Sequence, residues 1–156
     1  MSILGINRRN GSYTLIRNPR RLYPLVDDKL KTKELLEAHQ IPAPELYFTI
    51  SSNFELKALR EIKYLREFVI KPSRGAEGRG ILVIVNQQGN NWCKASGEMI
   101  SREDMEYHVS NVLAGLYSLG GVDDKAFIEY RIRETAFDLQ NVAAERLHHR
   151  SMVEAQ

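Results

Sequence analysis

The chain has 156 residues with 43% apolar and 27% charged side chains, which suits a globular protein of one domain or one and a half. No apolar run reaches the length of a membrane span, and the first residues lack the apolar core of a signal peptide. These features argue against membrane-embedded and secreted proteins. A single cysteine, Cys93, excludes an internal disulfide and a Cys-x-x-Cys site, and it fits a cytoplasmic protein.

Basic side chains are concentrated near the N-terminus. Residues 1–33 contain eight basic and two acidic side chains, a net charge of +6, so the rest of the chain carries −4 of the total of +2. Five of these basic residues precede the first predicted helix: Arg8, Arg9, Arg17, Arg20 and Arg21. Such a cluster favours a phosphate, carboxylate or nucleic-acid partner, although a solvated basic face explains it equally well.

The first 45 residues are predicted to form a basic N-terminal lead segment and a linker helix. Residues 1–26 are rich in Arg, Asn and Gly and are not expected to fold alone; Asn18 before a proline predicts a turn, and residues 23–26 are expected to pack or extend. A helix is predicted over 29–39, because Asp27 and Asp28 suit the positive end of its dipole and Pro42 and Pro44 end it.

A strand and a second helix are predicted next. Residues 46–50 have the β-branched and aromatic content of a strand. Ser52 and Glu55 have the spacing of a capping box at the start of an amphipathic helix over 54–65. Its buried stripe is predicted to contain Leu56, Leu59, Ile62 and Leu65.

Residues 67–86 predict a strand, a glycine-rich hairpin loop and a second strand. An apolar run ends at Lys71, and Pro72 has no N–H to continue the ladder. The loop over 73–80 has three glycines that would let backbone N–H groups approach a ligand, and Lys71 could reach the same place. A cation with free amides suits a polyphosphate. A hairpin without a ligand is the alternative, and the spacing matches neither a Walker loop nor a dinucleotide fingerprint.

The remaining chain alternates strands and helices. Residues 92–95 predict a short strand, and Ser101 with Asp104 predicts a capped helix that runs to residue 119 and ends at Gly120-Gly121. Its buried face is predicted to contain Met105, Val109, Val112, Leu113 and Leu116. Residues 125–132 alternate as a strand, and residues 134–156 read as a helical or disordered tail. The order predicts an α+β fold with a mixed or antiparallel sheet and flanking helices.

The order of these segments resembles the ATP-grasp superfamily, and within it the alpha-L-glutamate ligase-like proteins. The resemblance covers residues 3–133. It rests on NPRRLYPLVDDKLKTKELLEAHQIPAPELY (18–47), REFVIKPSRGAEGRGILVI (66–84), WCKASG (92–97), GLYSLGG (115–121) and FIEYRI (127–132). It implies an ATP-grasp N-terminal portion, with residues 46–133 as a nucleotide-binding lobe.

The resemblance also implies roles for individual residues. Lys71 would contact the α- and β-phosphates of ATP, and Lys29 would approach the phosphates from its helix. The loop would cover the β- and γ-phosphates through Ser73, Arg74, Gly75, Gly78, Arg79 and Gly80. A hinge strand would hold the adenine edge through the backbone around Glu129, Tyr130 and Ile132. Lys29 could equally be a surface helix lysine, and Glu129 could simply pair with Arg131 or with a lysine of a neighbouring strand.

The family reaction is ATP-dependent carboxylate–amine ligation through an acyl phosphate, with Mg²⁺ held in a C-terminal lobe. Residues 134–156 do not resemble the strands expected there, so that lobe is expected to be largely absent and catalytic residues are not assigned. Asp138, Asn141 and Glu145 have the spacing of a solvated helix and are not assigned to metal; His148-His149 is read as exposed. We expect ATP binding without full ligase activity, with unknown carboxylate and amine substrates, no membrane partner, and a possible homo-oligomer or partner chain. The alternative is a non-enzymatic module that binds nucleic acid or a protein through the basic N-terminal segment.

Overall fold

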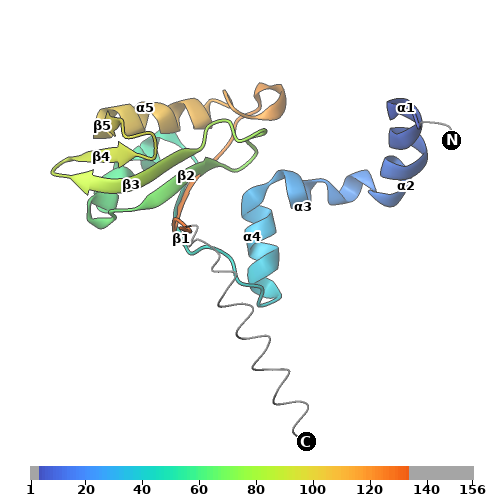
Figure 1. Cartoon of the computed structure of the whole chain (residues 1–156), viewed down its shortest axis with the longest axis horizontal. Coiled ribbons are helices and arrows are strands. Elements are labelled where there is room, and N and C mark those ends of the chain that lie inside the picture. The colour runs from blue at the N-terminus through green and yellow to red at the C-terminus, as the bar shows by residue number, and fades with distance from the viewer. Residues whose placement is uncertain (1–3, 134–156) are drawn as a thin grey trace, which may run out of the picture.

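A six-stranded antiparallel sheet forms the centre of the molecule in the computed structural model, which describes residues 4–133 (Figure 1). Its strands follow the order β1-β6-β2-β3-β4-β5, and every neighbouring pair is antiparallel. Their bounds are β1 Leu46–Ile50, β2 Phe68–Pro72, β3 Leu82–Gln88, β4 Asn91–Lys94, β5 Met99–Ile100 and β6 Ala126–Glu129. The α+β prediction is therefore confirmed, with the sheet antiparallel. Insertion of β6 between β1 and β2 brings the last strand beside the glycine-rich hairpin.

Short helices precede the sheet and extend away from it in Figure 1. They are α1 Ile6–Arg9, the π-helical turn η1 Asn10–Thr14, α2 Leu15–Arg17, the 3₁₀ turn η2 Arg20–Leu22 and α3 Pro24–Asp27, and none of them contains a buried residue. Asn18 leaves the helical conformation, as predicted for a residue before proline. The expectation for residues 23–26 is corrected to a helix, because Pro24 at its first turn has the φ that a helix requires.

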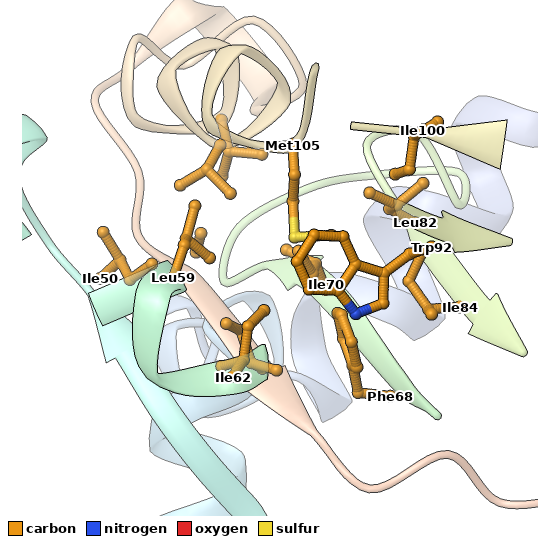
Figure 2. Close-up of a cluster of buried hydrophobic side chains, with 14 of the residues drawn as sticks. Ile50, Leu59, Ile62, Phe68, Ile70, Leu82, Ile84, Trp92, Ile100 and Met105 are labelled. Atoms are coloured by element: carbon orange, nitrogen blue, oxygen red, sulfur yellow. The ribbon is translucent and has the colours of Figure 1, made fainter. Parts of the chain in front are cut away.

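One face of the sheet is covered by η3 (Asn53–Tyr64) and α5 (Arg102–Leu113), whereas α4 (Lys29–Ala38) lies on the other side (Figure 1). The buried core therefore lies between the sheet and the pair η3 and α5. Figure 2 shows Trp92 among the core side chains of both layers. Sheet and helices contribute Ile50, Phe68, Ile70, Leu82, Ile84, Trp92, Ile100, Ala126, Ile128, Leu59, Ile62, Met105, Val109, Val112 and Leu113.

The predicted α-helix over 54–65 is a 3₁₀ helix in the structure, η3. Ser52 makes no side-chain cap, and Glu55 instead accepts a hydrogen bond from the Ser51 N–H at 2.8 Å. The apolar residues recur every three positions, which is the period of a 3₁₀ helix, so this winding keeps the stripe on one side. Leu59 and Ile62 are fully buried, and Leu56 and Leu65 pack against the core as partly buried side chains.

Helix α5 begins as predicted and ends earlier. Ser101 and Asp104 form the capping box, but the helix ends at Leu113 and not at Gly120-Gly121, which lie in the 3₁₀ turn η4 (Leu119–Gly121). Gly115 has a φ of +74°, and a Cβ there would lie 2.3 Å from the Val122 carbonyl oxygen, so this glycine turns the chain directly after the helix. Leu116 consequently falls outside the helix and is 64% exposed, contrary to the prediction.

Strand β6 is shorter than predicted, because it ends at Glu129. All four of its residues are buried, so both faces of this strand are covered by other parts of the protein. Tyr130 and Ile132 follow the strand and are exposed at 51% and 67%. The predicted tail, with Asp138, Asn141, Glu145 and His148-His149, lies outside the described residues.

Candidate functional site

Strands β2 and β6 place Lys71 and Glu129 on the same side of the sheet. Val69 pairs with Glu129 and Lys71 pairs with Phe127, and residues directly opposite each other in neighbouring strands share a face. The Lys71 Nζ lies 2.5 Å from the Glu129 Oε1. Ile70 and Ile128, next in sequence, point into the core on the opposite face. Glu129 therefore pairs with a lysine of a neighbouring strand, one of the two alternatives that the sequence left open.

Lys33 also contacts Glu129, a contact that was not predicted from the sequence. Its Nζ lies 2.7 Å from the Glu129 Oε2 and donates a hydrogen bond to the Pro44 carbonyl. The side chains of Lys33 and Glu129 are 13% and 5% exposed, so this carboxylate is buried between two ammonium groups. Lys29 and Lys33 are one helical turn apart on α4, so they lie on the same face of this helix. That spacing could have indicated Lys33 as a second cation near the site.

A cleft of about 580 Å³ opens beside this cluster. Its lining contains Lys71, Glu129, Tyr130 and Ile132, together with the apolar side chains of Val69, Ile81 and Val83. The segment after β6 and the lysine at the end of β2 therefore border one hollow with an apolar wall and a charged end. The size lies within the range of small-molecule sites in proteins.

The backbone after β6 offers hydrogen-bonding groups at the rim of this cleft. The Tyr130 N–H is already used, because it donates to the Glu45 carbonyl at 2.8 Å. Among the described residues, the N–H groups of Arg131 and Ile132 have no acceptor. The Arg131 and Arg133 guanidiniums both contact the Glu67 carboxylate, which fixes this segment to the start of β2.

The root of the glycine-rich loop is held by the start of α4. The Lys29 N–H donates to the Ser73 carbonyl at 2.9 Å, and the Lys29 Nζ donates to the Gly75 carbonyl at 2.6 Å. Burial is the largest effect on the pKa of Lys29 and lowers it; Asp124 opposes this effect and Lys71 adds to it. Lys29 is thus partly buried at the loop, which contradicts its reading as a plain surface lysine.

Two carboxylates also hold the root of the glycine-rich loop. Asp28 caps α4 and accepts a hydrogen bond from the Ser73 hydroxyl, and the buried Asp124 accepts the Arg74 N–H at 2.9 and 3.0 Å. Burial raises the pKa of Asp28, but the Ser73 hydroxyl, the N–H groups of Lys31 and Leu30 and the Arg74 charge together bring it below its ordinary value. The role of Asp28 as a helix opening is therefore confirmed, and it also fixes the loop.

The loop has a close-packed root and an open tip. A Cβ at Gly75 would lie 2.2 Å from the Pro72 Cγ, whereas Gly78, with φ of +74°, faces open space. Gly75 forms an isolated bridge with Ser118. Arg79 at the tip pairs with Glu77 at 2.8 Å, with both side chains exposed. The tip thus has few contacts that would prevent it from moving.

A histidine of α5 holds the far end of the loop. The His108 Nε2 lies 3.0 Å from the Gly80 carbonyl oxygen, which only accepts, so this nitrogen carries the proton. The His108 ring packs against Tyr117 with 5.5 Å between ring centres. Burial lowers the pKa of His108, and the bond to Gly80 opposes that effect. No pattern in the sequence predicted this contact.

The predicted site residues therefore fall into two neighbouring groups. Lys71, Glu129, Tyr130 and Ile132 border the cleft beside β6. Lys29, Arg74 and Gly75 line a second hollow of about 440 Å³ next to α3, and Ser73 is buried at the root of the loop. Gly78, Arg79 and Gly80 line neither hollow. Within residues 4–133, the structure contains no group of three or more His, Cys, Asp or Glu side chains that could hold a metal ion.

The profile of a family described as sugar-transfer associated ATP-grasp matches residues 8–147. The chain belongs to this ATP-grasp family. No curated protein and no solved structure matches the chain significantly.

The match extends beyond the segments on which the resemblance rested, because it includes residues 134–147. It supports the ATP-grasp assignment, whose members bind ATP with Mg²⁺, but not the glutamate-ligase-like subtype. It also includes most of the basic N-terminal segment, and it gives no support to a separate nucleic-acid or partner-binding module. In the part of the chain that the structure describes, no helix is long and apolar enough to cross a membrane.

Proposed function

We propose that this ATP-grasp chain binds ATP in the cleft beside β6, with the phosphates toward Lys71 and the base along the segment after Glu129. One observation carries the proposal: Lys71 and the segment 130–132 border the same hollow. Adenine needs a donor and an acceptor in an apolar slot. The unused N–H groups of Arg131 and Ile132 supply donors, and the side chains of Val69, Ile81 and Val83 supply the apolar wall.

The phosphates would compete with Glu129 for Lys71. In the structure Glu129 forms ion pairs with two ammonium groups, those of Lys71 and Lys33. A polyphosphate can replace the carboxylate as the partner of Lys71, while Lys33 keeps Glu129 from being left buried and unpaired. We therefore propose that Lys33 is a positioning residue that allows Lys71 to turn toward a ligand.

The glycine-rich loop is the proposed cover of the phosphates. Its root is fixed through Ser73, Arg74 and Gly75, and its tip at Gly78 and Arg79 has room to move. A loop of this kind can bring backbone N–H groups onto a bound phosphate without disturbing the strands that carry it. Lys29 would then act through the loop, because its ammonium binds the Gly75 carbonyl.

The proposed reaction is ATP-dependent ligation of a carboxylate to an amine through an acyl phosphate, as in glutamate-ligase-like relatives. We propose that it occurs in association with sugar transfer, as the description of the family states. Bound Mg²⁺ would neutralise charge on the phosphates during phosphoryl transfer. The described residues show no cluster that fits this ion, so we assign them nucleotide binding only.

The proposed organisation keeps residues 1–45 as a lead and linker helix, 46–133 as the nucleotide-binding lobe and 134–156 as a tail. The end of the first unit contributes to the site, because Lys29 and Lys33 of α4 contact Gly75 and Glu129 of the second. We propose that the two units act together in nucleotide binding.

Titration calorimetry with Mg-ATP tests the site. We expect Lys71→Ala to weaken binding at least about tenfold, since a charge-assisted hydrogen bond contributes about 1.5–3 kcal/mol. Lys57→Ala is the matched control, because Lys57 is exposed on η3 and lies over the Phe54 ring, away from the cleft. Equal affinity of the two variants would reject the proposed position of the phosphates.

A further inference from the structure

Another, smaller cleft lies on the side of the sheet that η3 and α5 cover. Its volume is about 190 Å³, and Arg60 and Lys63 of η3, Arg102 of α5 and Trp92 of β4 line it with Gln87 and Asn90 of the β3–β4 hairpin. Gln87 pairs with Trp92, because the register shifts between Ile84 and Asn86 and returns Gln87 to the face of Trp92. The ATP cleft is lined by other residues and faces the opposite side of the sheet.

The charge of this cleft is entirely positive. Three of its lining side chains are cationic and none is acidic. Within residues 4–133, Arg60, Lys63 and Arg102 take part in no ion pair, although seven ion pairs are formed elsewhere. Like charges gathered in one hollow repel one another, and an anion placed among them removes that cost.

A buried tryptophan belongs to the same lining. Trp92 is 2% exposed, and its Nε1 has no hydrogen-bond partner among the described residues (Figure 2). An indole nitrogen can only donate, and leaving a buried donor unpaired costs about 1–3 kcal/mol. The Nε1 atom is itself covered by protein, so Trp92 reports on the cleft that it lines, and the three cations supply the contacts to an anion.

We propose that this cleft binds a phosphate group. Arginine forms paired hydrogen bonds with phosphate oxygens, and two arginines with a lysine match the charge of a dianion better than that of a single carboxylate. The volume is several times the share of one water, about 30 Å³, and below the range of about 300–1,000 Å³ for sites that hold drug-sized ligands. It suits one phosphate group and not a nucleotide, so this site is separate from the ATP cleft.

The chain carries its own probe for this site, because Trp92 is its single tryptophan. The indole N–H of the full chain therefore gives one resonance in a ¹H–¹⁵N spectrum. We expect inorganic phosphate, added at constant ionic strength, to shift this resonance in a saturable way, and sodium chloride to leave it in place. A second titration uses glycerol 3-phosphate in place of inorganic phosphate. The ligand that binds more tightly shows whether free or esterified phosphate is the natural form.

Variants make the test specific. Arg60→Gln with Arg102→Gln is expected to weaken the phosphate response at least about tenfold. Lys57→Gln, on the same helix but outside the cleft, and Lys71→Ala, in the ATP cleft, are expected to keep it. The proposal is overturned if neither phosphate ligand shifts the resonance, if the double variant responds like the unaltered chain, or if acetate binds as tightly as phosphate.

Discussion

Single residues with restricted surroundings fix the geometry of the candidate ATP site. Glu129 is buried between Lys33 and Lys71, and Gly75 lies against Pro72 where a side chain has no room. Lys29 holds the carbonyl of that same glycine. The position of the loop root therefore depends on the absence of one Cβ atom and on one ammonium group.

Replacement of Gly75 tests this dependence. A Cβ at Gly75 would lie 2.2 Å from the Pro72 Cγ, so Gly75→Ala must displace the loop root and is expected to cost about 1–3 kcal/mol, as overpacking does. It should also weaken ATP binding. Gly78→Ala is the control: its Cβ meets open space, and only the positive φ costs about 1 kcal/mol. Urea unfolding and calorimetry measure both effects, and equal losses for the two variants would contradict a packed root.

At the level of elements, η3 and α5 decide where the apolar residues go. The sequence identified both segments, but η3 winds as a 3₁₀ helix and α5 stops six residues before the predicted end at 119. The 3₁₀ winding of η3 keeps its apolar residues, which are three positions apart, on one side of the helix. The earlier end of α5 removes Leu116 from the buried face.

A pair of leucine variants tests these boundaries. Leu59→Ala removes a fully buried side chain of η3 and is expected to lower the free energy of unfolding by about 2–5 kcal/mol. Leu116→Ala removes a side chain that is 64% exposed and is expected to change it by no more than about 0.5 kcal/mol. Urea unfolding of both variants gives the comparison. A large loss for Leu116→Ala would mean that α5 continues past Leu113.

At the level of the whole molecule, ion pairs and hydrogen bonds connect parts that are far apart in sequence. Glu67 at the start of β2 binds Arg131 and Arg133 after β6, and Asp28 at the start of α4 binds Ser73 after β2. The hydrogen bond from Arg133 is the largest effect on the pKa of Glu67 and lowers it, and Arg131 lowers it further against the effect of burial. These contacts hold the segment after β6 and the loop root on the sheet.

The stability of the molecule should therefore fall in acid. A carboxylate whose pKa is lowered by folding contributes stability above its unfolded pKa, about 4.3 for a glutamate, and loses it as the pH falls through the lower folded value. We expect Glu67→Gln to reduce this acid dependence, measured by urea unfolding between pH 7 and pH 3. Glu61→Gln, at an exposed residue without an ion pair among the described residues, should leave it unchanged. An identical pH profile for Glu67→Gln and the unaltered chain would rule out this contribution.

Much of the fold was predictable because its signals are local. The run 68–71, the loop glycines and the run from Leu82 define a hairpin by their own preferences, and Ser101 with Asp104 starts α5 through a bond within one turn. The end of α5 was not predictable in the same way. It depends on the Val122 carbonyl approaching Gly115, a contact that exists only after the chain has folded back.

The sequence by itself determined the ATP-grasp family resemblance and the α+β class, because motif order and strand alternation need no tertiary information. It left open whether Glu129 pairs with Arg131 or with a lysine of a neighbouring strand. Only the tertiary structure paired Glu129 with Lys71 and Lys33, tied Lys29 to the loop and placed Arg60, Lys63 and Arg102 in one cleft with Trp92. These groups come from elements that are distant in the chain. Their proximity follows from the packing of helices on the two faces of the sheet, which no local pattern encodes.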